Sequence, residues 1–300
     1  MERKRHLFDS LFQYWALLPT IIVLILLTLY PGIRLVILSL SKVVIASGKS
    51  SNVFVGLQNF RTMFADPVVG PALLNTAIIV VVSVIAETVV GTILASFTSS
   101  VISFNAVYRT LIIFPLLIPP IAIGVIWFLL YNYSFGGLNQ LIGLFGVAGP
   151  AWLANPSLAL WSVVILDIWH WTSFLFLIIL AGIESLPLDT KEAARIDGAS
   201  ETRIFFSITL PLLRPTLAVA VMLRTIFAFK VFDEIYLLTS GGPGTSTQVV
   251  SLYIEQVFFN QFQFGYASSL ALSIGIVVAI FVIVYRRFVL GGGSYAAGGT

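Results

Sequence analysis

The chain has 300 residues, of which 58% are hydrophobic and 10% are charged, and its mean hydropathy is +1.02. An ordinary soluble domain has charge on about a quarter of its residues, so this composition excludes one and predicts a polytopic membrane protein. Cysteine is absent, which excludes disulfides, thiolate nucleophiles and cysteine-ligated metals.

The first residues, 1–13, are predicted to be a cytoplasmic segment that leads into a retained membrane anchor. They contain Arg3, Lys4 and Arg5, and no small-residue cleavage site follows the next apolar run. That run, 15–40, is long enough to cross a bilayer of about 30 Å with some tilt.

Six apolar stretches predict six membrane spans within residues 14–290. The boundaries expected from the sequence are 15–40, 71–97, 107–131, 157–182, 216–239 and 266–290. External connections are expected at 41–72, 132–156 and 240–264, and a cytoplasmic connection at 186–211. The predicted fold class is an all-α membrane protein, with residues 291–300 as a flexible tail or a vector-derived remnant.

The third span contains Pro115, Pro119 and Pro120, which lack backbone donors near the middle of the bilayer. Carbonyls freed there must be satisfied by neighbouring helices or a wet cavity, so we expect this span to be bent and buried.

The orientation follows from the distribution of lysine and arginine. Ten such residues lie at the termini and in one set of connections, and three lie in the other set. The ten are Arg3, Lys4, Arg5, Arg109, Lys191, Arg195, Arg203, Arg214, Arg286 and Arg287, and the three are Lys42, Lys49 and Arg61. Because the cytoplasmic side has the excess of positive charge, both termini and the segment 186–211 are predicted to be cytoplasmic.

The segment 186–211 is predicted to form two short helices, which we call the elbow. Asp189 is expected to cap the first helix with Glu192 returning a bond, and Gly198 to end it in a left-handed conformation. Ser200 is the expected cap of the second helix. Two prolines, Pro211 and Pro215, are expected to separate this helix from the next span, which would leave Lys191, Arg195 and Arg203 exposed on a docking element.

Glu192-Ala193-Ala194, Gly198 and Ile208-Thr209-Leu210-Pro211 resemble the EAA loop of binding-protein-dependent ABC importer permeases with the MetI-like fold. The resemblance implies that this loop docks on a cytoplasmic ATPase subunit. The coupling residues that it implies are Glu192, Ala193, Ala194, Gly198, Ile208, Leu210 and Pro211. The alternative is an amphipathic interfacial helix without a partner.

Ionisable residues inside the spans are costly and therefore functional candidates. They are Glu87, Asp167, His170, Arg224 and Lys230. A salt bridge from Asp167 to Arg224 and a substrate contact by Asp167 remain equal alternatives, and Glu87 is expected to tether its span to a neighbour. For His170, a satisfied histidine in the bundle is weighed against a ligand. Metal binding is not expected, because the two histidines, His6 and His170, are too far apart to share an ion.

Helical spacing places Asp167, His170 and either Trp171 or Phe174 on one face of the fourth span. Aromatic rings beside hydrogen-bonding groups suit a sugar, whose ring stacks and whose hydroxyls need partners.

The segment from Arg224 through Ala228-Phe229 and Phe232-Asp233 to Gly241-Gly242-Pro243 is similar to sugar permeases of the maltose and glycerol-phosphate type, and the similarity extends over 54–290. It implies a substrate path that contains Asp167, His170, Trp171, Phe174, Arg224 and Phe229. It also implies a binding-protein contact at Gly241, Gly242, Pro243 and Thr245, with Asp233 and Glu234 as an acidic outer rim.

The chain has no Gly-x-x-x-x-Gly-Lys-Ser/Thr loop, so it is not expected to be an enzyme, and ATP and magnesium are expected on partner chains. The resemblance implies a second permease, two ATPase subunits and an external solute-binding protein in a bacterial or archaeal cell membrane. The alternatives are a stand-alone secondary transporter and a permease for a non-carbohydrate solute.

Overall fold

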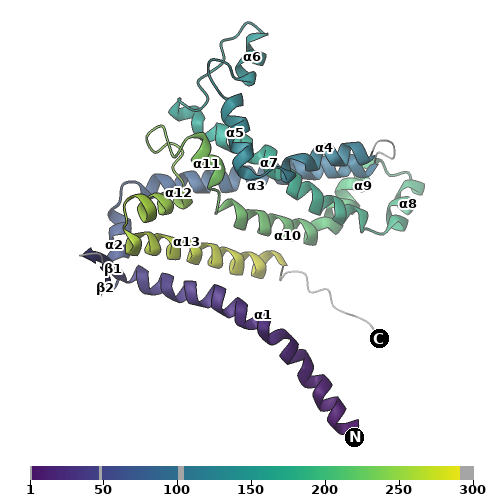
Figure 1. The fold of residues 1–300 in the computed structure, drawn as a ribbon. Helices are drawn as coiled ribbons and strands as arrows, with labels where there is room; N and C mark the ends of the chain where they lie inside the picture. Colours follow the sequence, from purple (N-terminus) through teal and green to yellow (C-terminus); the bar gives the residue numbers. More distant parts are fainter. Residues whose placement is uncertain (1, 47–48, 101–104, 291–300) are drawn as a thin grey trace. The chain divides into compact units, whose positions relative to one another are not determined.

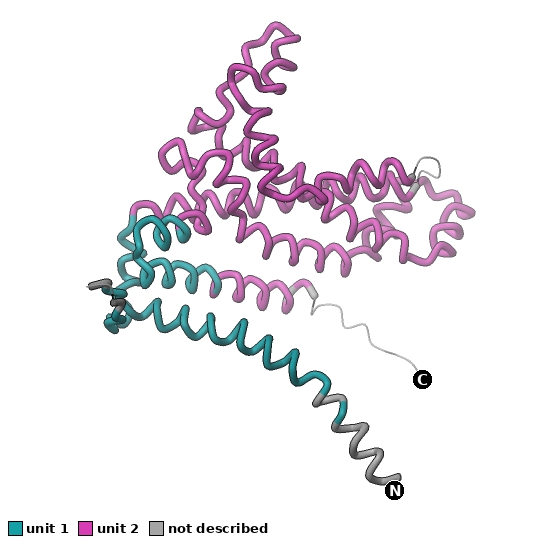
Figure 2. The backbone as a smooth tube through the Cα atoms, viewed as in Figure 1, with its two compact units in different colours: residues 1–66, 254–275 teal, residues 67–253, 276–300 magenta. Residues whose placement is uncertain are grey.

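The computed structural model in Figure 1 describes residues 2–46, 49–100 and 105–290, so the expected tail at 291–300 lies outside the described residues. Among these described residues, five helices are long and apolar enough to cross a membrane, and a bent helix pair provides a sixth candidate span. The chain divides into two compact units (Figure 2), which are 1–66 with 254–275 and 67–253 with 276–300.

The first unit contains the first span and the connection that follows it. The elements are α1 (Glu2–Ser39), β1 (Ser41–Ala46), β2 (Lys49–Phe54), α2 (Gln58–Ala65), the π-helical turn η2 (Gln256–Asn260) and the first half of α13 (Phe264–Tyr285). The strands form an antiparallel hairpin in which Lys42 pairs with Val53. This hairpin was expected to be a polar loop, because its serines and glycine obscure the alternation of apolar and polar residues in the strands.

The second unit is organised around α7 (Pro156–Glu184). Three long or bent elements, α3 (Val69–Ser100), α4 (Asn105–Leu117) and α10 (Leu210–Ala228), and the short α11 (Asp233–Leu238) all pack against it. One buried cluster near the outer half of α7 includes Val163 and Leu166, and another near the inner half includes Phe176 and Ile179. Because α7 is covered on several sides, polar side chains in its middle are removed from lipid.

The proline-rich third span is bent, as expected. It consists of α4 and α5 (Pro120–Leu130), whose axes differ by 97° across the break at Ile118 and Pro119. The expectation that this span is buried is wrong for the chain by itself, since Leu111, Phe114 and Ile121 are exposed. After α5 the connection contains the short helix α6 (Gly137–Gly143).

The fifth span differs from the prediction at both ends. Helical structure runs without a break from α9 (Glu201–Ile204) through the π-helical turn η1 (Phe205–Thr209) into α10, so the two prolines do not separate the elbow from the span. Pro211 is the second residue of α10, directly after η1, and it does not interrupt the helix. At the outer end, α10 stops at Ala228 rather than Thr239, and α11 and α12 (Val250–Glu255) follow as separate helices.

Candidate functional site

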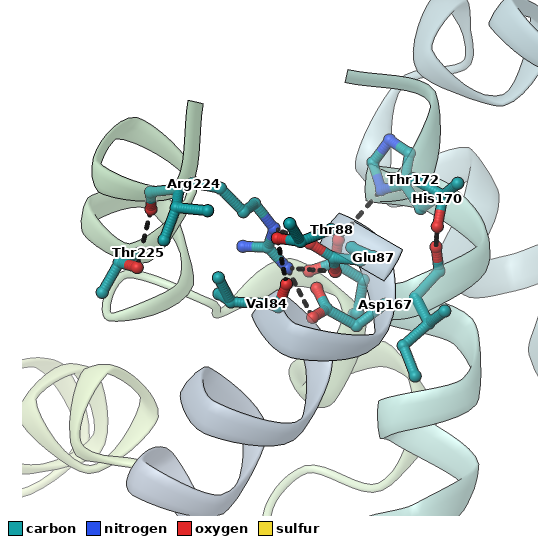
Figure 3. Close-up of polar contacts among 11 residues, drawn as sticks. Val84, Glu87, Thr88, Asp167, His170, Thr172, Arg224 and Thr225 are labelled. Carbon is teal, nitrogen blue, oxygen red and sulfur yellow. Dashed lines mark hydrogen bonds and ion pairs between the residues drawn. The ribbon is translucent and has the colours of Figure 1, made fainter. Parts of the chain in front are cut away.

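A buried ionic cluster joins three helices of the second unit (Figure 3). The guanidinium of Arg224 on α10 donates to both carboxylate oxygens of Glu87 on α3, over 2.6 and 2.8 Å. The same guanidinium donates to Asp167 Oδ2 on α7 over 2.5 Å. All three side chains are at most 1% exposed. We call these three residues the charge triad.

The salt bridge between Asp167 and Arg224, one of the two alternatives for Asp167, is therefore confirmed. Glu87 was expected to tether its span to a neighbouring helix, and its partner is Arg224 on α10. Sequence reasoning identified Glu87 as an ionisable residue inside a span but did not assign it to Arg224. Two carboxylates share one guanidinium, so the triad has more negative than positive groups. An ion pair removed from water needs such close contacts to offset the loss of hydration.

His170 is also paired and buried. Its Nδ1 lies 3.3 Å from Glu234 Oε1, and the two side chains are 3% and 5% exposed. The prediction that Glu234 belongs to an acidic outer rim is wrong, because the chain breaks after α10 and α11 packs against α7. Two residues of α7, Asp167 and His170, were considered as substrate ligands. Each of them is paired with another side chain of this protein.

An aromatic surface lies beside the triad and is more open than it. The rings of Trp171 and Phe227 stack at 5.6 Å, and Phe174 meets both rings edge to face. The guanidinium carbon of Arg224 lies 4.8 Å from the centre of the Trp171 ring. Phe227 is 41% exposed, and Trp171 and Phe174 are partly exposed. Sequence reasoning missed Phe227, although its position three residues after Arg224 indicated a shared helix face.

The remaining residue expected on the path, Phe229, lies just beyond the end of α10. Its ring centre is 6.3 Å from that of Phe281. The ring is therefore partly covered by α13 rather than joined to the aromatic surface of Trp171, Phe174 and Phe227.

The connection between α11 and α12 is held by side chains of α3. Asn75 Nδ2 donates to the carbonyls of Thr245 and Gln248 over 3.0 and 2.9 Å, and Thr76 Oγ1 accepts from the Val250 amide over 3.1 Å. Gly241 has a φ of +91°, which suits glycine. Thr245 is exposed while Gly241 is buried, so the tip of this turn is what a partner could reach.

The elbow consists of α8 (Leu188–Ile196), α9 and η1. Its left-handed stop is confirmed, since Gly198 has a φ of +78° and Ala199 N donates to the Ala194 carbonyl over 2.9 Å. The cap at Ser200 is also confirmed, with Oγ accepting from Arg203 N. The prediction that Asp189 caps the first helix is wrong. Helix α8 begins at Leu188 with Pro187 in the N-cap position, so Asp189 lies in the first turn, and no side chain caps the helix.

An ion pair closes the Gly198 turn. Arg195 donates to the two carboxylate oxygens of Glu201 over 2.6 and 3.2 Å, and this contact raises the pKa of Arg195. Lys191 is half-buried rather than exposed as expected, and this partial burial, together with nearby Arg195, lowers its pKa. The outer face of the elbow presents Leu188 and Ile196, which are 68% and 86% exposed.

Among the expected coupling residues, Glu192, Ala193 and Gly198 are exposed. Ile208, Leu210 and Pro211 lie in η1 and the first turn of α10 and are partly buried. The elbow thus has exposed apolar residues on α8, and its second part, α9 and η1, continues as helix into the fifth span.

These features define a multi-pass membrane protein, and comparison with known proteins identifies its class. Residues 87–290 match the family described as binding-protein-dependent transport system inner membrane component. The chain belongs to this family and is a permease subunit of an ATP-driven ABC importer, in which ATP hydrolysis takes place on a separate chain.

Several curated relatives are transport permeases. The chain is 35% identical over 281 residues to the sulfoquinovosyl glycerol transport system permease protein SmoG of Agrobacterium fabrum, covering 94% of this chain and 91% of that protein. It is 39% identical over 234 residues to the trehalose/maltose transport system permease protein MalF of Thermococcus litoralis, covering 78% and 79%.

A solved structure shares the fold. It is a chain of a bacterial ABC transporter involved in the import of the acidic polysaccharide alginate, with a TM-score of 0.84 and 22% identity over 97% of this chain and 99% of that chain. Over the part of the chain that the structure describes, no group of three or more histidine or acidic side chains could hold a metal ion.

Proposed function

We propose that this permease subunit forms half of the translocation path for a sugar or a sugar-like solute. The observation that supports this best is the partly exposed aromatic surface of Trp171, Phe174 and Phe227. Aromatic faces stack against the apolar faces of sugar rings and tolerate more than one sugar. The two relatives named above are described as permeases for trehalose/maltose and for sulfoquinovosyl glycerol, which supports the same class of solute for this chain.

In this proposal the residues of the expected path divide into two layers. Trp171, Phe174 and Phe227 meet the solute, while the charge triad and His170 hold α3, α7, α10 and α11 together behind them. Arg224 acts directly on the surface, since its guanidinium lies against the Trp171 ring and limits how that ring can turn. Phe229 is proposed to line the path beyond Phe227.

The partners follow from the exposed surfaces. The elbow, with Glu192, Ala193 and Ala194 on its first helix, is proposed to dock on one of two ATPase subunits that bind ATP and magnesium. The exposed apolar faces of α4 and α5 are proposed to be covered in part by a homologous second permease. The external binding protein is proposed to contact the turn at Gly241, Gly242, Pro243 and Thr245.

The orientation completes the proposal. Both termini and the elbow face the cytoplasm, where ATP is available, and the chain spans a bacterial or archaeal cell membrane.

The test is a solute screen on the assembled complex. The complex is reconstituted with its binding protein, and ATPase stimulation and uptake are measured for neutral sugars, acidic sugars, polyols and amino acids. We expect a sugar or polyol to stimulate, and Phe227→Ala to reduce uptake of that solute more than the control Phe259→Ala, which changes an exposed phenylalanine in η2. Stimulation by amino acids alone, or equal loss in both variants, would contradict the proposal.

A further inference from the structure

The external cap of the first unit, defined as the hairpin β1–β2 and helix α2, has an exposed face that neither the transport path nor the elbow explains. Helix α2 contains no buried residue. Arg61 and Phe64 are three residues apart on α2 and lie on one face, and the N-cap residue Leu57, whose carbonyl accepts from the Arg61 amide over 3.1 Å, precedes them by one turn. Leu57 is 62% exposed, Phe64 is 85% exposed, and Arg61 is exposed between them.

The opposite side of α2 is attached to the end of the first span. Asn59 Nδ2 donates to the carbonyls of Ser39 and Ser41 over 2.8 and 3.0 Å, at the junction of α1 and β1. Tyr266 at the start of α13 donates to Asp66 Oδ2 over 2.6 Å, just after α2. The exposed face is thereby held at the level where two spans, α1 and α13, leave the bilayer.

The hairpin continues the same combination of basic and apolar side chains. In its register Lys42 lies opposite Val53, and Val44 lies two residues along on the same face as Lys42. Lys42, Val44 and Val53 are all exposed. Moreover, the three basic residues of the external connections, Lys42, Lys49 and Arg61, all belong to this cap.

We propose that the external cap lies in the headgroup region of the outer leaflet and binds anionic phospholipid. Phenylalanine and leucine enter the boundary between headgroups and acyl chains, while Lys42 and Arg61 meet phosphate groups. Three features of the cap select lipid over a protein partner. It is continuous with two spans, its apolar residues are interspersed with basic ones, and α2 is fixed to the span ends by Asn59. Binding there anchors the outer end of α1.

Because this chain has no native cysteine, a label attached to it reports on the introduced residue only, and the assembled complex without an introduced cysteine gives the background from the partner chains. Phe64→Cys and Thr62→Cys are each labelled with bimane in nanodiscs that contain spin-labelled anionic or zwitterionic phospholipid. Thr62 is a matched control on the same helix, since it is exposed but points away from the face of Leu57, Arg61 and Phe64. We expect the label at residue 64 to be quenched strongly by lipid and the label at residue 62 to be quenched mainly by aqueous iodide.

Charge is tested by adding Lys42→Gln or Arg61→Gln to the Phe64→Cys protein. A lysine or arginine near an anionic surface strengthens binding to anionic lipid. Loss of one should therefore weaken the preference of the residue-64 label for the anionic over the zwitterionic quencher about fivefold. Equal lipid quenching at residues 62 and 64, or a preference unchanged by both substitutions, would overturn the proposal. Protection of residue 64 from lipid quencher on addition of the solute-binding protein would assign the surface to that protein instead.

Discussion

The charge triad makes an asymmetric prediction about single substitutions. Glu87 and Asp167 both depend on Arg224, so Arg224→Gln leaves two buried carboxylates without their guanidinium. Breaking a buried ion pair by removing one partner costs about 3–5 kcal/mol. Glu87→Gln instead leaves the neutral pair of Arg224 and Asp167, and the amide oxygen can still accept from Arg224. We expect this second change to cost about 1–2 kcal/mol, the size of one charge-assisted hydrogen bond.

The assay is unfolding of the purified permease in mixed micelles with increasing SDS, followed by fluorescence of the native tryptophans. The expected difference between the two variants is about 1–4 kcal/mol, which is measurable against a typical unfolding free energy of about 5–15 kcal/mol. The control is Arg195→Gln, which removes an exposed ion pair and should leave the unfolding midpoint unchanged. The combined change of Glu87→Gln, Asp167→Asn and Arg224→Gln should recover part of the loss, because no buried charge is then unpaired.

Two results would refute this reasoning. One is equal destabilisation by Arg224→Gln and Glu87→Gln, which would mean that the two carboxylates do not both rely on Arg224. The other is strict additivity of the three substitutions in the combined variant, which would show that the three side chains do not interact energetically.

Two further predictions concern the partner surfaces. Gly198→Leu should leave the permease assembled but abolish coupled transport, because a side chain at a φ of +78° strains the turn that orients α8. Uptake and ATPase activity are measured together, and normal stimulation of the ATPase by the binding protein would contradict the prediction. Thr245→Cys carrying a crosslinker should capture the external solute-binding protein, since this residue is exposed at the tip of the turn after α11; capture of the ATPase subunit would overturn the proposed orientation as well.

The sequence by itself determined the features that depend on local chemistry. Apolar stretches of sufficient length indicated the spans, and Pro115, Pro119 and Pro120 predicted the bend in the third one. Gly198 and Ser200 predicted the turn and the cap of the elbow, because each acts on backbone groups within a few residues of itself. These predictions required no knowledge of which helices are neighbours.

The tertiary structure alone decided which polar groups meet across helices. Glu87 lies 137 residues before Arg224. Nothing in the local sequence pattern indicated that Arg224 would bind the carboxylates of both α3 and α7. The burial of Glu234 depended on the break after Ala228, which a continuous apolar stretch did not reveal. Such pairings are set by the rotation and depth of packed helices, and local periodicity describes only one helix at a time.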